Sequence, residues 1–435
     1  MMNLTKEEIA KLQEPKDDKM AMLREELKGQ IDFSGMLVGE IKKGEQYEEA
    51  IRVTENLKIT AGIWYLAVPD PQNDALRDRF GLSYVEGGMS PEVAFEFLYR
   101  LGVRGISFHY PGELGEDNHA KINEMLSERG MYIASIAANT FSYPIFSAGG
   151  PSNNDPRIRE IALLMNMRAQ ELGKRYGCRF QTDWAGRDAL AGHFIHAASE
   201  KWRWTRQIYA TNLISVNGEV GYAIEFKPYD PGERAVIPDV NAALRMCMEV
   251  EEEVRQTLIH AYGEEEGEML FESNYRGKMG VNIEDAHVYL LGGHQTVADA
   301  VDLCLEAGRL FLRHPNDSLG KIDTDDVFGK YHPFDALEAC YYEVSRGYDG
   351  AYEPDIFPKD DDRLRAFIAS INQISKFRTY ARILMEEPWA KRLEEAKKSG
   401  KPSEVYELLD DLLTMKLDYP KIPLDLADRF RRDVL

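Results

Sequence analysis

The sequence predicts an α/β protein organised as a (β/α)8 barrel, with a helical segment before the barrel and a helical arm after it. A short β-prone run followed by a helical pattern recurs eight times between residues 58 and 385. Parallel strands need helical crossovers, and eight such units close a sheet into a TIM barrel. Acidic residues and histidines also collect where the predicted strands end, which is where such barrels build their active sites.

The length of the chain sets its expected domain organisation. At 435 residues it exceeds the roughly 250–300 at which a single core usually stops growing. Residues 1–57 carry apolar positions at helical spacing and are expected to form a helical extension without catalytic residues. Residues 58–385 are the predicted catalytic barrel. Residues 386–435, broken by Pro402 and Pro420, are expected to form a helical arm that packs on a neighbouring subunit of a dimer or tetramer, or on the barrel.

Each predicted strand is a run of apolar, β-branched or aromatic residues bounded by turn residues. The eight strands are expected at residues 58–66, 105–109, 131–137, 179–184, 222–227, 278–284, 308–313 and 350–355. The first crossover helix begins at Ser90, an N-cap residue followed by a proline at the first helical position. The next two helices are expected near residues 116–129 and 155–174, and the helix after the fourth strand is expected to end near residue 206. The last four are expected at residues 238–260, 295–306, 333–345 and 361–385.

Charge and composition limit the classes of partner. A net charge of −21 argues against binding to nucleic acid, which depends on lysine and arginine contacts to phosphate, and is compatible with a neutral substrate. The sequence lacks an apolar run of about 18 residues, so a membrane span is not expected, and neither is secretion. Four widely separated cysteines suggest neither disulfides nor a zinc ribbon, and they favour a cytoplasmic location: Cys178, Cys247, Cys304 and Cys340.

The acids and histidines at the predicted strand ends are the candidate site residues. They are His109, Glu225, Lys227, Glu284, His287, His314, Asp323, Asp325 and Asp355. Side chains alternate along a strand, so Glu225 and Lys227 point the same way. Asn282 and Glu284 do so as well. A carboxylate such as Glu284 can bridge two cations, and a nearby neutral imidazole, His287, suits Mn²⁺, Co²⁺ or Zn²⁺.

Five stretches of the sequence resemble xylose isomerases, and they occur in the order found in that family. The stretches are Ala-Ile-Glu-Phe-Lys-Pro-Tyr-Asp-Pro (223–231), Phe-Ser-Tyr-Pro-Ile-Phe-Ser-Ala-Gly-Gly (141–150), Trp-Ala-Gly-Arg-Asp (184–188), Asn-Ile-Glu-Asp-Ala-His (282–287) and Asp-Thr-Asp-Asp-Val-Phe-Gly (323–329). The resemblance runs from about residue 58 to residue 355. It implies a metal-dependent aldose–ketose sugar isomerase on a TIM barrel.

The resemblance also implies a role for each candidate residue. A first metal ion would bind Glu225, Glu284 and Asp355, with His314 at the remaining position, and a second would bind Glu284, His287, Asp323 and Asp325. Lys227 would hydrogen-bond the substrate oxygen at carbon 1, His109 would assist ring opening, and Asp323 would hold the metal of the catalytic water. The substrate would contact Asn282 and apolar walls made by Trp64, Phe141 and Trp184, and Phe80 would be an aromatic residue lent to a neighbouring subunit.

The sequence departs from the family at two of these positions. His314 stands where the family has an aspartate, which is similar to L-rhamnose isomerase and the ketose 3-epimerases. An imidazole is softer and neutral, so it shifts the metal preference from Mg²⁺ toward Mn²⁺, Co²⁺, Fe²⁺ or Zn²⁺. The second departure is Gly112, in place of the aspartate expected to orient His109. Either Glu113 or Glu116 replaces it, or the substrate is not handled like xylose.

The expected reaction is a 1,2-hydride shift on a neutral monosaccharide, with two divalent ions acting as Lewis acids. The ions are expected to be Mn²⁺, Co²⁺ or Mg²⁺, with Zn²⁺ and Fe²⁺ as further candidates. The alternative enzyme is a ketose 3-epimerase, in which Glu225 and Asp355 exchange a proton at carbon 3. A third alternative is a non-catalytic metal- or sugar-binding paralogue that has lost ring opening through Gly112.

Overall fold

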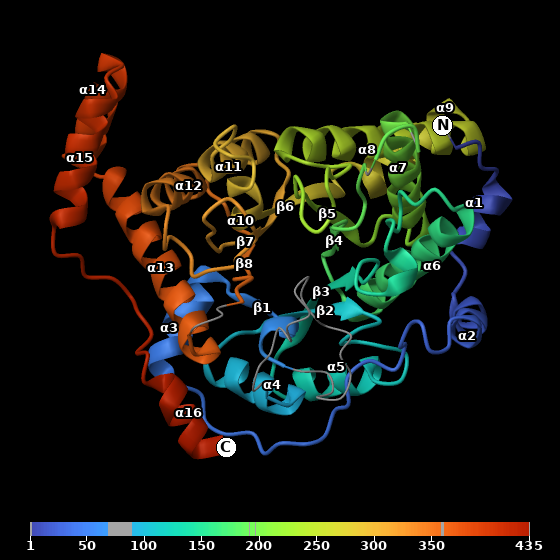
Figure 1. The fold of residues 1–435 in the computed structure, drawn as a ribbon, viewed down its shortest axis with the longest axis horizontal. Coiled ribbons are helices and arrows are strands. Elements are labelled where there is room, and N and C mark those ends of the chain that lie inside the picture. Colours follow the sequence, from blue (N-terminus) through green and yellow to red (C-terminus); the bar gives the residue numbers. More distant parts are fainter. Residues whose placement is uncertain (1, 68–88, 191, 196, 358–360, 435) are drawn as a thin grey trace.

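The computed structural model describes residues 2–67, 89–190, 192–195, 197–357 and 361–434 (Figure 1). Phe80 lies outside these ranges. The strands in the described ranges form two sheets, and every neighbouring pair is parallel. The three-stranded sheet consists of β1 (Thr60–Gly62), β2 (Gly105–Tyr110) and β3 (Tyr132–Ala138). The five-stranded sheet consists of β4 (Phe180–Trp184), β5 (Gly221–Glu225), β6 (Met279–Glu284), β7 (Leu310–His314) and β8 (Ala351–Tyr352).

The edge strands of the two sheets contact each other at two junctions. At one junction Ile59, just ahead of β1, forms an isolated parallel bridge with Tyr352 of β8. At the other junction Ser135 of β3 lies beside Thr182 of β4, with the two side-chain oxygens 3.0 Å apart. The Thr182 backbone N–H also donates to Ser135 Oγ at 3.1 Å. The predicted α/β class with parallel strands is therefore confirmed.

Helices surround the strands, as Figure 1 shows. The crossover helices are α4 (Pro91–Arg100), α5 (His119–Ser127), α6 (Pro156–Tyr176), α7 (Ala198–Ser215), α8 (Val240–Tyr262), α11 (Val297–Glu306), α12 (Pro333–Ser345) and α13 (Arg363–Leu384). The predicted barrel region also contains shorter helical segments: η1 (Ile63–Tyr65), η2 (Pro144–Phe146), α9 (Glu264–Leu270), η3 (Phe271–Tyr275) and α10 (Asp285–Tyr289). Several helices begin at a side chain that accepts a backbone N–H, as Asp155 does for α6 and Asp239 for α8.

The two terminal segments pack on the outside of this arrangement. The N-terminal helices α1 (Lys6–Leu12), α2 (Asp17–Glu26) and α3 (Glu48–Leu57) contact α7, α6 and α13 respectively. The C-terminal helices α14 (Trp389–Ser399) and α15 (Pro402–Thr414) form a pair that projects from the body, and α16 (Leu426–Val434) returns to it (Figure 1). There Phe430 packs on Phe97 of α4, with ring centroids 5.1 Å apart.

The structure corrects three of the predicted elements. The first strand is only β1, because the chain turns at Gly62 into η1 and lays the Trp64 indole over the glycine, where a Cβ would lie 2.2 Å from the ring. The eighth strand is likewise limited to Ala351–Tyr352. After the fourth strand a loop comes first, and α7 then continues to Ser215 instead of ending near residue 206. A short apolar run cannot distinguish a strand from a turn of helix, which explains the first error.

Along the five-stranded sheet, one face changes from apolar side chains near the strand starts to polar side chains near the strand ends. Toward their start, Gly280 of β6 lies against the Phe311 ring, where a Cβ would be 2.3 Å from the ring. Phe311 packs there with Phe180 and Ala223. Toward the strand ends the same face carries polar side chains. The register pairs Glu225 with Asn282, and Glu284 with His314.

Two further observations bear on the expectations from composition. All four cysteines are buried and free. None of the helices in the part of the chain that the structure describes is long and apolar enough to cross a membrane.

Candidate metal centre

Two groups of buried side chains at the strand ends have the geometry of metal ligands. One consists of Glu225, Glu284 and His314, and the other of Glu284, His287 and Asp323. Within each group the potential ligand atoms lie within 4.8 Å of one another. Glu284, the last residue of β6, belongs to both groups. The residues come from β5, from β6 with the start of α10, from β7, and from the loop after β7.

The first group is centred on the imidazole of His314. Its Nδ1 lies 3.1 Å from Glu225 Oε2 and 3.7 Å from Asp355 Oδ2. Asp355 is not part of the tighter group, but Trp64 Nε1 donates a 3.0 Å hydrogen bond to its Oδ1 and turns the carboxylate toward the cluster. Asn282 Nδ2 donates to Glu225 Oε2 at 2.5 Å and lies 3.1 Å from His314 Nδ1. The Asn282 amide therefore lies directly beside two of the candidate metal ligands.

The second group is centred on His287. Its Nε2 lies 3.1 Å from Glu284 Oε2 and 3.2 Å from Asp323 Oδ2. Lys227 Nζ forms a 2.5 Å ion pair with the same oxygen of Asp323. Asp325 follows on the same loop with a φ of 47°, a left-handed conformation that costs free energy in a non-glycine residue.

Carboxylates outnumber cationic groups in the cluster, and this imbalance shifts the pKa values of several of them. Burial, with Asp323 and Glu225 as the nearest charges, raises the pKa of Glu284 well above its ordinary value. Burial also raises the pKa of Asp355, to about 6 against the opposing effect of His314. Against its own burial, the pKa of Glu225 is lowered to about 2 by His314. Five buried or half-buried carboxylates therefore share one ammonium group, that of Lys227, and an excess of negative charge remains: Glu225, Glu284, Asp323, Asp325 and Asp355.

The donor set fits divalent metal ions. Oxygen and imidazole nitrogen ligands in a buried, negatively charged cluster suit Mn²⁺, Co²⁺ and Zn²⁺. Buried polar atoms also lack hydrogen-bond partners among the described residues, notably His287 Nδ1 and Asn282 Oδ1. A buried polar atom without a partner is costly, and ligand or metal binding is a common reason for one.

An aromatic wall continues from the cluster toward the three-stranded sheet. Trp64 lies against His109 with ring centroids 4.4 Å apart, and His109 lies 5.3 Å from Phe141. Phe141 contacts Trp184 at 4.6 Å, and the Trp184 ring stacks at 6.5 Å on His287. The three predicted wall residues and both histidines therefore line one continuous surface.

Glu113, and not Glu116, is the carboxylate beside His109. His109 Nδ1 lies 3.1 Å from Glu113 Oε2, and the His109 backbone N–H donates to the same oxygen at 2.5 Å. The Glu113 side chain is fully buried. Glu116 instead accepts hydrogen bonds from Tyr110 Oη at 2.6 Å and from Arg168. Although burial opposes it, Glu113 raises the pKa of His109.

Comparison with known proteins adds a sequence relationship. No model of a protein family matches the chain. Over 314 residues the chain is 26% identical to the xylose isomerase of Thermus thermophilus, covering 67% of this chain and 72% of that protein. The xylose isomerase of Thermus caldophilus is 25% identical over the same length and coverage. The resemblance to xylose isomerases is confirmed.

Solved structures of similar shape include two epimerases. A structure of L-ribulose 3-epimerase aligns with a TM-score of 0.49 and 11% identity, covering 76% of this chain and 98% of that one. D-Psicose 3-epimerase with D-tagatose, from Clostridium cellulolyticum H10, aligns with a TM-score of 0.48 and 9% identity, covering 75% and 99%.

Two buried residues at the cluster were missed by the sequence analysis. Asn316 Nδ2 donates to Glu284 Oε1 at 2.9 Å and lies 3.4 Å from Asp325 Oδ1, while its Oδ1 accepts the Ala286 N–H. Glu353 lies one residue beyond β8, with Oε1 3.4 Å from His314 Nε2. Both residues follow a strand end, which was the available signal, but neither stands at a position that the resemblance to xylose isomerases implies.

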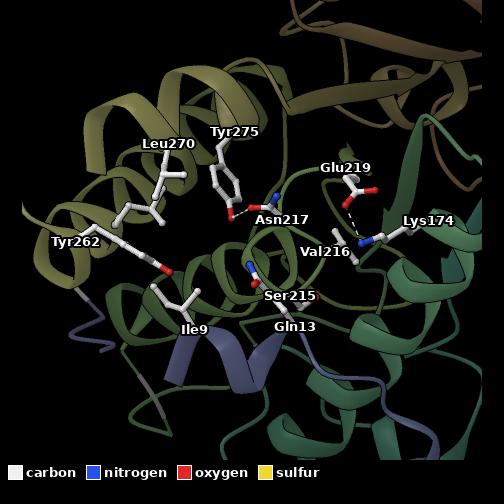
Figure 2. A pocket seen from close by; sticks show the side chains of 11 residues that line it. Ile9, Gln13, Lys174, Ser215, Val216, Asn217, Glu219, Tyr262, Leu270 and Tyr275 are labelled. Atoms are coloured by element: carbon white, nitrogen blue, oxygen red, sulfur yellow. Dashed lines mark hydrogen bonds and ion pairs between the residues drawn. The ribbon is translucent and has the colours of Figure 1, made fainter. Parts of the chain in front are cut away.

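A separate cavity of about 270 Å³ lies at the other end of the strands (Figure 2). Ile9 of α1 and Gln13, just after this helix, line it together with Asn217, which lies before β5, and Tyr275, which lies before β6. Tyr275 Oη donates to Asn217 Oδ1 at 3.1 Å. The cavity contains none of the predicted site residues, so it is distinct from the metal-ligand cluster.

Proposed function

We propose that the chain is a metal-dependent aldose–ketose isomerase that acts on a neutral monosaccharide by a 1,2-hydride shift. The observation that carries this proposal is the membership of Glu284 in both ligand groups, since a shared carboxylate suits a pair of divalent ions. The sequence similarity to xylose isomerases supports the same reaction class. The ions would be Mn²⁺, Co²⁺ or Mg²⁺, with Zn²⁺ and Fe²⁺ as further candidates.

The two sheets together are proposed to form a single closed (β/α)8 barrel. Both outer edges of the three-stranded sheet meet an edge of the five-stranded sheet, at Ile59 and Tyr352 and at Ser135 and Thr182. In such a barrel the active site lies at the carboxyl ends of the strands, where the cluster is found. The proposed domains are a helical extension (1–57), the barrel (58–385) and a helical arm (386–435). We further propose a homodimer or homotetramer located in the cytoplasm.

The proposed ligand sets follow from the two groups. One ion would be held by Glu225, Glu284, His314 and Asp355, and the other by Glu284, His287, Asp323 and Asp325. The ions would act as Lewis acids on the sugar oxygens at carbons 1 and 2. Lys227 stays protonated, because Asp323 raises its pKa against the effect of burial. Its ammonium group would donate to the oxygen at carbon 1 and stabilise negative charge there.

His109 is proposed to move the proton that opens the sugar ring. Glu113 occupies the Nδ1 side of the imidazole, so Nε2 is the nitrogen available to the sugar. A carboxylate on Nδ1 fixes the ring orientation and stabilises the imidazolium form. Trp64, Phe141 and Trp184 would pack on the C–H face of the sugar and exclude water while hydrogen is transferred.

The test is a screen of aldopentoses, aldohexoses and deoxy sugars with Mn²⁺, Co²⁺ and Mg²⁺, repeated in D₂O. A hydride shift carries the substrate hydrogen to the neighbouring carbon, so we expect a ketose without solvent deuterium by mass spectrometry. Glu265→Gln, a change of an exposed acid on α9, serves as the matched control and should leave turnover unchanged. Absence of turnover with every sugar and metal would refute the proposal.

A ketose 3-epimerase is the second candidate, and His314 is the residue that favours it. The notable geometry is that Glu225 and Asp355, the required acid and base, both face His314 Nδ1. Proton exchange at carbon 3 of a ketose would introduce one solvent deuterium there, so repeating the D₂O experiment with ketopentoses and ketohexoses separates the two reactions. Turnover of either kind would exclude the non-catalytic paralogue.

A further inference from the structure

The imidazole of His314 lies between carboxylates on both of its nitrogen sides. Nδ1 faces the candidate metal position, 3.1 Å from Glu225 Oε2 and 3.7 Å from Asp355 Oδ2. Nε2, on the other side of the ring, lies 3.4 Å from Glu353 Oε1, and neither atom has a hydrogen-bond partner among the described residues, so the two are available to each other. Glu353 belongs to neither candidate ligand group.

Glu353 is held in place by contacts to two other strands, β7 and β2. Its backbone N–H donates to the Arg313 carbonyl at 2.8 Å, which continues the pairing of β8 with β7 by one residue. Its second carboxylate oxygen, Oε2, accepts a 2.7 Å hydrogen bond from Ser107 Oγ of β2. The side chains of Glu353 and His314 are 1% and 3% exposed, so water does not compete for this contact.

Strand alternation explains why Glu353 and Asp355 approach the same ring. Residues two apart on an extended chain point to the same side, so Glu353 and Asp355 lie at successive levels beside His314. Arg313, one position before His314, points the opposite way and binds Glu343, with Nε and Oε1 2.7 Å apart. Asp355 thus faces Nδ1 of His314, on the side of the candidate metal position, and Glu353 faces Nε2 on the opposite side of the ring.

We propose that Glu353, held by Ser107, is a positioning residue that fixes the tautomer of His314 for metal binding. A neutral imidazole carries one N–H, and a carboxylate can only accept. Glu353 would therefore keep the hydrogen on Nε2, which leaves the Nδ1 lone pair directed toward Glu225 and Asp355, where it could bind an ion held by these carboxylates. A carboxylate behind a histidine ligand orients the ring and raises its basicity. The inference rests on the proposed metal centre but not on its reaction.

The test measures metal binding by the whole protein, without reference to turnover. Metal-free protein is titrated with Mn²⁺ and with Co²⁺ in a calorimeter, and the visible spectrum of bound Co²⁺ is recorded. For Glu353→Gln we expect about tenfold weaker binding at one of two sites, and a larger loss for Glu353→Ala, within the roughly 10–100-fold typical of such partners. The Co²⁺ spectrum should change for that site only.

A second background separates positioning from a purely structural role. In His314→Asp protein there is no imidazole to orient, so adding Glu353→Gln should leave metal affinity unchanged or improve it. Glu251→Gln is the matched control, because Glu251 is a buried carboxylate bound to Arg309 at the opposite end of β6 and β7. It should leave metal affinity unchanged even if the thermal unfolding temperature of the metal-free protein falls.

Three results would overturn the inference: unchanged affinity in Glu353→Gln and Glu353→Ala, equal losses with and without His314, or no metal binding by the unaltered protein. If the Glu353 variants do not fold, Ser107→Ala keeps the carboxylate and should still weaken the same site by a few fold, since only its anchor is lost. Metal binding that responds as expected without sugar turnover would count against the proposed function alone.

Discussion

In the five-stranded sheet three of the candidate metal ligands are the last residues of strands, whereas beside the three-stranded sheet the partner of the key histidine comes from the turn after a strand. Glu225, Glu284 and His314 are the last residues of β5, β6 and β7. Their spacing is set by strand register, because Glu284 pairs with His314. His109 also lies on a strand, but Glu113 reaches it from beyond the end of β2.

The difference teaches which contacts strand geometry determines. On a strand, alternation and register fix both the direction of a side chain and its neighbours. In a turn the backbone path decides, so an orienting carboxylate can move by one residue and still reach the imidazole. We therefore expect substitutions on the five-stranded side to affect metal binding, and those around His109 to affect only the steps that involve the sugar ring.

Glu284→Gln should have the largest effect, because it alters both ligand groups at once. Lewis-acid stabilisation by a metal contributes several kcal/mol, and each 1.36 kcal/mol is a factor of ten in rate. We expect kcat/KM to fall by about 10³-fold or more, with weaker binding of both ions. Calorimetry of metal-free protein and steady-state kinetics measure the two losses. Loss of one ion only would show that Glu284 is not shared.

Glu113→Gln should have the next largest effect, and it should depend on the substrate. General acid–base catalysis typically contributes about 10²–10⁴-fold, and we expect a loss near the lower value for sugars that form rings. Glyceraldehyde is too short to close a ring, so its turnover should change little. The ratio of the two kcat/KM values is the readout, and metal affinity should be unchanged.

Glu116→Gln is the matched control for this ratio. It removes the negative charge of the group that accepts from Tyr110 Oη and Arg168, and it leaves the contact between His109 and Glu113 in place. Stability is expected to fall, while the ratio of cyclic to acyclic turnover stays as in the unaltered protein. An equal change of the ratio in both variants would mean that Glu113 has no special role.

Much of the frame was predictable from the sequence because it depends on local patterns. The helix over Pro333–Ser345 matches its predicted bounds, and Ser90 and Asp155 precede helices as expected. The lengths of the first and last strands were not predictable. They depend on how Trp64 folds back over Gly62 and on how far β8 pairs with β7, which are tertiary contacts.

The site divides in the same way. Strand alternation predicted that Glu225, Glu284 and their neighbours would converge, and they do so in the structure. Pattern left Glu113 and Glu116 equivalent, and only the path of the turn after β2 distinguishes them. Glu353 was overlooked because its importance depends on the ring orientation of a residue on another strand. The roles of these residues in binding and catalysis stay predictions.

Metal removal should affect the two sheets unequally. A ligand present at 100 times its Kd stabilises the form that binds it by about 2.7 kcal/mol, which corresponds to about 100-fold slower exchange of amides whose local opening would release the ligand. Ions bound at Glu284 and His314 should protect residues 279–287 more than residues 105–113 in hydrogen–deuterium exchange. Chelator-treated and Mn²⁺-loaded protein provide the comparison, and equal protection of both segments would contradict it.

Gly112→Asp should have the smallest effect, although it restores the residue that xylose isomerases carry there. Glu113 already occupies the Nδ1 side of His109, so a second carboxylate has no imidazole nitrogen left to orient. A Cβ at residue 112 would also lie 3.2 Å from Asn139 Nδ2, closer than most such contacts. We expect a slightly lower unfolding temperature and a smaller change in kcat/KM than for Glu113→Gln. A gain of activity in Gly112→Asp would mean that Glu113 only partly replaces the aspartate. If instead aspartate at residue 112 raises activity only when Glu113→Gln is also present, one orienting carboxylate can be exchanged for the other.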